Sequence, residues 1–155
     1  MSNLVRQSWN TLRHIPGGPR IFSKIVGQAA PYTGTINARV VDLEEGYCKV
    51  QLKDRRAVRN HLDSIHAIAM MNLGEMCTGL ALIYGMPDDA RGILKGLSME
   101  YLKKGRGTLT AECRTAIPDT RTRSELQVEG EIRDAQGDLV ARAHAQWVVG
   151  PKKKG

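Results

Sequence analysis

"HAIAMMNLGEMCTGLALI", residues 66–83, is the most apolar stretch of the chain. Polar side chains interrupt it only at Asn72, Glu75 and Thr78. If the stretch is helical, its apolar side chains lie on every side of the helix. A helix that is apolar all round has to be buried all round. We therefore predict a long central helix over about residues 64–83, with the rest of the fold packed around it.

The segments on both sides of this helix have the two-residue period of β-strands. Before it, residues 35–43 and 47–53 are a predicted hairpin, because "LEEG" between them supplies Gly46 for a turn with positive φ. After it, four strands are predicted in a meander. These strands lie near residues 93–103 and 107–116, and over residues 121–133 and 139–149.

The last two predicted strands each have one apolar and one polar face. Leu126, Val128 and Ile132 alternate with charged and amide side chains, and alanines occupy most inward positions of residues 139–149. Small inward side chains allow a helix to approach a sheet closely. We therefore predict an α+β protein with the hotdog fold, in which a curved antiparallel six-stranded sheet wraps around the central helix.

Two further helices are predicted near the N-terminus. Val5, Trp9 and Leu12 share one face of residues 2–13, and a second helix begins near Pro19 and ends before "APYTG" at residues 30–34. We predict a single hotdog domain over residues 1–155, divided into an N-terminal helical extension (1–31), a hotdog core (33–149) and a basic tail (150–155).

Composition places the chain among ordinary globular proteins. It has 155 residues, of which 41% are hydrophobic and 25% charged. "MSNLVRQSWN" lacks the apolar core of a signal peptide, and we expect no segment to span a bilayer. Cys48, Cys77 and Cys113 are widely spaced and form no CxxC pair, which favours reduced thiols over disulfides or zinc. We predict a cytoplasmic protein with no membrane insertion.

Asn60, the pair His66-Ala67, and Glu75 stand at a distinctive spacing at the start of the central helix. This pattern resembles the motif of the hotdog-fold acyl-CoA thioesterase superfamily, in particular its phenylacetyl-CoA thioesterase-like branch and the uncharacterised relatives of that branch. The branch has an Asn, then His-Gly six residues later, then an acidic residue nine positions after the His. The resemblance extends over roughly residues 33–149.

The resemblance implies hydrolysis of acyl-CoA or acyl-carrier thioesters without a metal or an organic cofactor, because the CoA moiety belongs to the substrate. Glu75 matches the catalytic carboxylate, and Ala67 stands where the family has a glycine whose N–H binds the thioester oxygen. Asn60 and His66 match polar residues that position water and thioester. The chain departs from the branch in having Ala67, Ile68 at an often-glycine position, and Glu in place of Asp.

The residues themselves support part of this assignment. A carboxylate on an apolar helix is costly, and burial raises its pKa toward the range of a general base. The alternative is that Glu75 caps a backbone group or pairs with a buried Arg. With Asp63 or Ser64 as the predicted N-cap, the free N–H groups near His66 and Ala67 offer a site for a developing oxyanion.

Helix geometry places the two halves of this site in different chains. Nine residues separate His66 from Glu75, which is a rotation of about 900° and a rise of roughly 13 Å. The two residues therefore point in opposite directions and are too far apart to bind one thioester. Two chains related by a two-fold axis bring Glu75 of one to Ala67 of the other. We predict a homodimer, and the sequence leaves open whether dimers pair into a homotetramer.

The net charge of +7 favours anionic partners. Two basic clusters are candidate contacts for the phosphates of CoA, although charged turns are also commonly just solvated. Their members are Arg55, Arg56, Arg59, Lys103, Lys104 and Arg106.

Two other functions compete with hydrolysis. A non-catalytic acyl-CoA or acyl-ligand-binding hotdog protein is suggested by Ala67-Ile68. A nucleic-acid-binding protein would use the positive charge, but the chain lacks the interleaved aromatic residues that stack on bases. No GxSxG motif is present, and His61 and His66 are badly spaced for a shared metal. We predict no metal and no nucleic acid as ligands.

Overall fold

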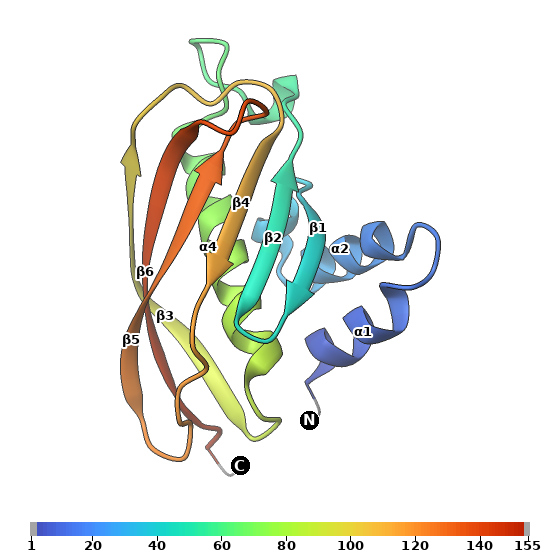
Figure 1. Cartoon of the computed structure of the whole chain (residues 1–155), viewed down its shortest axis with the longest axis vertical. Helices are drawn as coiled ribbons and strands as arrows, with labels where there is room; N and C mark the ends of the chain where they lie inside the picture. The colour runs from blue at the N-terminus through green and yellow to red at the C-terminus, as the bar shows by residue number, and fades with distance from the viewer. Residues whose placement is uncertain (1–2, 154–155) are drawn as a thin grey trace.

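The computed structural model describes residues 3–153, and in it one sheet curls around a central helix (Figure 1). The helices are α1 (Leu4–Leu12), α2 (Gly18–Ala29), α3 (Pro31–Gly34) and α4 (Ala67–Gly85), with a single 3-10 turn at Arg56–Val58. The strands are β1 (Arg39–Glu44), β2 (Tyr47–Leu52), β3 (Ala90–Tyr101), β4 (Leu109–Arg114), β5 (Ser124–Arg133) and β6 (Leu139–Pro151). This is the hotdog fold, as the sequence predicts.

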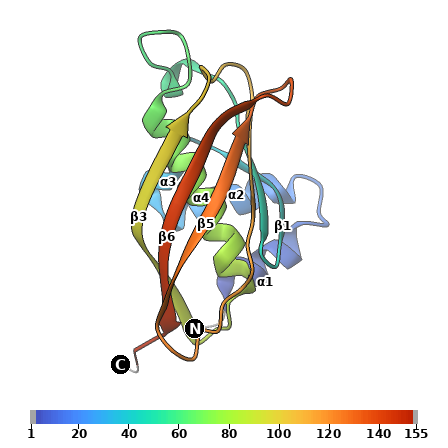
Figure 2. The same cartoon turned by 60° about the vertical axis from the view of Figure 1, so that its left-hand side comes forward.

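The six strands lie in the order β1-β2-β4-β5-β6-β3, and every pairing is antiparallel. The predicted meander is therefore wrong for β3, which pairs with β6 rather than with β4 (Figure 2). Two-residue alternation shows which side chains of a strand face inward, but it does not show which strand lies beside it. As a consequence, β1 and β3 are the two edges of the sheet.

Helix α4 is the core of the protein. Twelve of its 19 residues are buried, and all six strands pack against it as the sheet curves around it (Figure 2). By length and composition α4 could cross a membrane, contrary to our expectation that no segment is long and apolar enough. However, 67% of its most apolar window is buried inside the fold, as in the core helices of other proteins. Packing against the sheet and α1 accounts for most of its apolar surface.

The close approach of α4 to the sheet depends on small side chains, as predicted. A Cβ added at Gly74 would lie 2.8 Å from Ala143 Cβ on β6 and 3.1 Å from Met99 Cε on β3. The alternating faces of β5 and β6 are also as predicted, with Val128 and Ile132 buried inside. Glycine on the helix and alanine on the strand therefore set the distance between the two layers.

The N-terminal extension covers the side of the fold beyond β1 (Figure 1). Trp9 of α1 and Phe22 of α2 are buried and pack edge to face, with their ring centroids 5.1 Å apart. Residues 31–34 form the short helix α3, where only a break was expected. At the other end of the chain, β6 continues to Pro151, so the tail begins after Pro151 and not at residue 150 as predicted. Residues 154–155 of the predicted tail lie outside the described part.

The three cysteines are free and buried, and the fold brings them together. Cys48 of β2 and Cys113 of β4 are directly opposite in the ladder, and Cys77 of α4 donates a hydrogen bond to the Cys48 carbonyl (3.4 Å). The interaction with Cys48 and burial raise the pKa of Cys77, and burial raises the pKa of Cys113 to about 12. The thiols of Cys77 and Cys113 therefore stay protonated near neutral pH.

We expect Gly74→Ala to lower the free energy of unfolding by about 1–3 kcal/mol, because the new methyl group has to displace Ala143 and Met99. Helix propensity alone gives the opposite sign, a gain of about 1 kcal/mol. Urea unfolding of the two proteins measures the difference. A more stable variant would show that α4 and the sheet accommodate the added methyl group without strain.

Candidate active site

The helix start is built by His66, which is the N-cap of α4. Its Nδ1 accepts a hydrogen bond from the Ile68 N–H (3.0 Å). The predicted N-cap, Asp63 or Ser64, is wrong. Ile65 is held extended by a bridge to Arg59 and by its N–H bond to the Gly105 carbonyl (2.7 Å), so the helix cannot begin before Ala67.

Asn60 organises the loop that leads into the helix. Its Oδ1 accepts hydrogen bonds from the Leu62 N–H (2.9 Å), the Ser64 N–H (3.3 Å) and the Ser64 hydroxyl (3.1 Å). Asp63 in the same loop has a φ of 52°, a conformation that this tight turn requires. The carboxamide oxygen of Asn60 is thus occupied in shaping the loop.

Ala67 presents a free donor at the tip of α4. His66 occupies the Ile68 N–H with its ring and the Met70 N–H with its carbonyl (3.1 Å). Within residues 3–153, the N–H groups of Ala67 and Ala69 have no hydrogen-bond partner. Free N–H groups at the positive end of a helix attract negative charge. The first turn of α4 can therefore bind an oxyanion.

Glu75 has the environment that a general base requires. Its side chain is half-buried, and desolvation raises its pKa above the ordinary value of 4.5. Within the described part of the chain its carboxylate has no hydrogen bond or ion pair. A Cβ added at Gly79 would lie 3.9 Å from Glu75 Oε1 and 3.1 Å from the Trp147 ring, so the carboxylate and the indole both border Gly79. The capped or paired Glu75, our alternative interpretation, is not observed.

Four predicted site residues thus fall into two groups. Asn60, His66 and Ala67 are together at the helix start, whereas Glu75 lies two turns further along the continuous helix α4. Eight residues from Ala67 to Glu75 correspond to a rise of about 12 Å. One chain therefore does not bring the carboxylate to its own helix tip.

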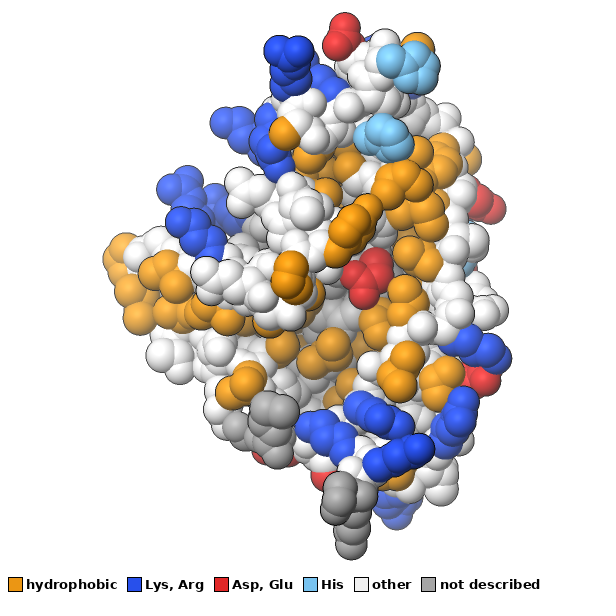
Figure 3. All heavy atoms as spheres, turned by 180° about the vertical axis from the view of Figure 1, so that it is seen from behind, with side chains coloured by type: hydrophobic (Ala, Val, Ile, Leu, Met, Phe, Trp, Pro, Cys, Tyr) orange, Lys and Arg blue, Asp and Glu red, His pale blue; other side chains and the backbone are white. Residues whose placement is uncertain are grey.

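Around Glu75, part of the apolar interior is left open, and we name this region the uncovered face. It comprises Ile68 and Met71 of α4 and Leu97, Met99 and Tyr101 of β3. Ile68 is 49% exposed and Tyr101 43%, although Leu97, Met99 and Tyr101 stand opposite buried alanines of β6 and so point to the inner side of the sheet. Figure 3 shows apolar side chains gathered on one face of the molecule around an acidic group.

Tyr101 is a further residue of the candidate site, and the sequence did not indicate it. Its hydroxyl donates a hydrogen bond to the Ala67 carbonyl (2.8 Å), which ties the end of β3 to the first turn of α4. Burial raises the pKa of this phenol, so it remains a donor. Thirty-four positions separate the two residues, and no local pattern connects them.

Most of the basic candidates already have partners. Arg59 binds Asp54 (2.7 Å), Lys103 binds Asp134 (2.6 Å) and Asp138 (2.7 Å), and Arg55 and Arg106 donate to backbone carbonyls. Arg56 and Lys104 are exposed. Contact of these residues with CoA phosphates stays a prediction.

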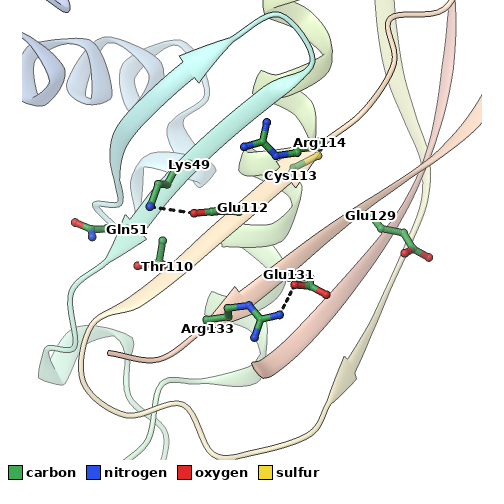
Figure 4. Close-up of a pocket in the computed structure, with 9 residues that line it drawn as sticks. All are labelled: Lys49, Gln51, Thr110, Glu112, Cys113, Arg114, Glu129, Glu131 and Arg133. Carbon is green, nitrogen blue, oxygen red and sulfur yellow. Dashed lines mark hydrogen bonds and ion pairs between the residues drawn. The ribbon is translucent and has the colours of Figure 1, made fainter. Parts of the chain in front are cut away.

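The outer face of the sheet has a hollow of about 470 Å³ between β2, β4 and β5 (Figure 4). Its charges neutralise one another, because Lys49 pairs with Glu112 (3.0 Å) and Arg133 with Glu131 (2.6 Å). This is the solvated face of an antiparallel sheet. No group of His, Cys, Asp and Glu in residues 3–153 is arranged to hold a metal ion.

The fold and its central helix place the chain in the class of hotdog-fold proteins, and comparison with known proteins agrees. The family described as "Domain of unknown function (DUF4442)" matches residues 18–149. The chain therefore belongs to the DUF4442 family. No curated protein sequence matches the chain.

Solved structures share the fold over nearly the whole chain. A structural-genomics protein designated APC5556 is 30% identical, with a TM-score of 0.83, over 96% of this chain and 99% of its own. A thioesterase family protein from Silicibacter pomeroyi is 16% identical (TM-score 0.69; coverage 84% and 96%). The thioesterase HI1161 from Haemophilus influenzae is 13% identical (TM-score 0.70; coverage 84% and 92%). The last two similarities establish the fold only.

We expect Asn60→Ala to lower the free energy of unfolding by roughly 1–3 kcal/mol, because three donors lose their acceptor. Asn60→Asp retains an oxygen at the same place and should keep most of the stability. Thermal or urea unfolding of both variants measures this. Equal stability of Asn60→Ala and the parent protein would mean that the loop does not depend on this side chain.

Proposed function

We propose that this protein is a homodimeric thioesterase that hydrolyses acyl-CoA thioesters. The observation that supports it most is Glu75, a half-buried carboxylate of raised pKa that has no partner in residues 3–153. A structural role would give such a group a hydrogen bond or a counter-charge. Left unpaired beside an open apolar face, Glu75 is available to a water molecule or a substrate.

In the proposed mechanism, Glu75 removes a proton from water, and the oxygen of that water attacks the thioester carbonyl. The N–H of Ala67 in the partner subunit stabilises the negative charge that develops on the carbonyl oxygen. The carbon–sulfur bond then breaks, and the CoA thiolate takes up the proton. Direct attack by the Glu75 carboxylate, followed by hydrolysis of the resulting anhydride, is the alternative with the same residues.

The second copy of the chain is required because of the distance along α4. A two-fold axis beside Glu75 would place two copies of α4 antiparallel, with each carboxylate facing the other helix tip. The edge strand β3 supports this arrangement, because its outer ladder groups are unpaired within the sheet and its inward side chains belong to the uncovered face. Pairing there would cover the apolar surface and complete the site.

The relatives support this proposal through the fold. The proteins from Silicibacter pomeroyi and Haemophilus influenzae carry thioesterase in their names, but at 16% and 13% identity they indicate a class of activity by analogy. The argument for hydrolysis therefore depends on Glu75 and the free helix tip.

An acyl-CoA-binding protein without turnover is the second candidate. Ile68, exposed at the helix tip, adds volume where a thioester would have to approach the Ala67 N–H. Acyl-CoA binding by the purified protein without release of free thiol, over several acyl chain lengths, would favour this candidate.

We expect Glu75→Gln to lower kcat for acyl-CoA hydrolysis by about 10²- to 10⁴-fold, the usual contribution of a general base. Thiol release measures the rate. Glu100→Gln, on the exposed outer face of β3, is the matched control and should keep the parent rate. Full activity of Glu75→Gln would contradict the assignment.

The raised pKa of Glu75 also predicts two pH dependences. The base acts when deprotonated, so kcat/KM should rise with pH through an apparent pKa above 4.5. Because folding raises this pKa, the folded state binds the proton more tightly, and ionised Glu75 lowers stability. Glu75→Gln should therefore be more stable than the parent protein near neutral pH, and the difference should vanish below 4.5. A constant difference would argue against burial of the carboxylate.

We expect Leu97→Lys to raise the dimer dissociation constant by about tenfold or more, because an unpaired charge would be buried on the uncovered face. Ser98→Lys, on the opposite face of the same strand, is the control. Sedimentation velocity over a concentration series measures association, and activity should fall in parallel. A parent protein that stays monomeric at every concentration would refute the shared site.

A further inference from the structure

A second hollow lies between α2 and the adjoining ends of β1 and β2, with a volume of about 380 Å³. Four exposed cations line it, and no acidic residue does. They are Arg20, Lys24, Arg39 and Lys53. We call this hollow the cationic groove.

The charges of the cationic groove are not neutralised by the rest of the fold. Within residues 3–153, none of the four side chains makes an ion pair or a hydrogen bond. In contrast, Arg59 and Lys103 of the sequence-derived clusters are bound to aspartates. Neighbouring cations without counter-charge repel one another and create a positive potential that draws in anions.

Two further hollows that share lining residues lie between the groove and the helix tip. The first, of about 210 Å³, is bordered by His66, Ile68 and Thr35. Thr35 also borders a second hollow of about 520 Å³ beside α3, which reaches Met76, the neighbour of Glu75. Lys24 is shared by this second hollow and the cationic groove.

In Figure 3, Lys and Arg side chains gather at two places on the margin of the face that carries the apolar region, at the upper left and at the lower right. Lys53 directly follows β2, and residues 54–66 run from there to the start of α4. The groove and the helix tip therefore lie at the two ends of one connecting segment.

Resting on the proposed function, we propose that the cationic groove binds the phosphate groups of the CoA end of the substrate. Two arginines and two lysines can form charge-assisted hydrogen bonds to several phosphate oxygens. The long, mostly uncharged pantetheine arm then lies in the hollow beside α3, and the thioester reaches the tip of α4. Arg20 and Lys24 of the groove belong to α2, whereas Arg39 begins β1 and Lys53 follows β2, so none of the four is on α4.

The test combines a double variant with two substrates. Lys24→Glu/Arg39→Glu should raise KM for acyl-CoA by about tenfold or more, since each lost charged hydrogen bond has a large effect. The corresponding acyl N-acetylcysteamine thioester has no phosphates, so its hydrolysis reports on the thioester site alone and should change less than twofold. Calorimetric binding of adenosine 3′,5′-bisphosphate should weaken by a similar factor to the KM change.

Arg121→Glu/Arg123→Glu is the control, because it makes the same charge change at exposed positions between β4 and β5. It should bind the bisphosphate like the parent protein. Arg56→Glu/Lys104→Glu tests the competing clusters. The groove is refuted if its variant binds the bisphosphate normally, or if the competing variant alone loses binding.

The bisphosphate-binding measurement also tests this proposal separately from the proposed function. If the parent protein hydrolyses no thioester but binds the bisphosphate through the groove, hydrolysis fails and the groove stands. If Glu75→Gln abolishes hydrolysis while the groove variant behaves like the parent on both substrates, the groove fails and the thioesterase stands.

Discussion

The packing of α4 inside the sheet is the constraint on which the other features depend. The helix is apolar on all sides, and the six strands of one chain enclose most of it through contacts as close as Gly74 against Ala143. The enclosure stops at β3, the edge strand, where Met71 and Leu97 remain partly exposed. The same geometry that forms the core therefore leaves an apolar opening, and Glu75 lies in that opening.

The two parts of the candidate site lie at the two ends of one segment of α4, and each part supplies a different chemical group. The tip supplies N–H donors, held open because His66 caps the Ile68 N–H and leaves that of Ala67 free. The middle of α4 supplies the Glu75 carboxylate. Within residues 3–153, no hydrogen bond or counter-charge offsets its loss of solvation. The fold of a single chain holds the helix tip and the carboxylate in position independently of each other. The proposed hydrolysis requires both halves, and this requirement would link activity to the association of two chains.

The sequence predicts those features that repeat along the chain or come from its composition. The apolar run gives α4, and alternation gives the inward faces of β5 and β6. The spacing of Asn60, His66 and Glu75 gives candidate site residues, whose roles stay a prediction. It does not predict the partner of β3, because pairing depends on the whole sheet. The N-cap was also misplaced, because the extended Ile65 is held by Gly105 from a distant turn. The sequence does not indicate the cationic groove, because its four cations are spread from Arg20 to Lys53.

The cysteine cluster has a practical consequence. Cys48, Cys77 and Cys113 lie at the contact between α4 and two strands, and at most 2% of each is accessible. Alkylating reagents attack the thiolate, and the protonated thiols of Cys77 and Cys113 offer almost none. Modification therefore requires the sheet to separate from the helix. The labelling rate of these native thiols would report how often the core opens, without any added probe.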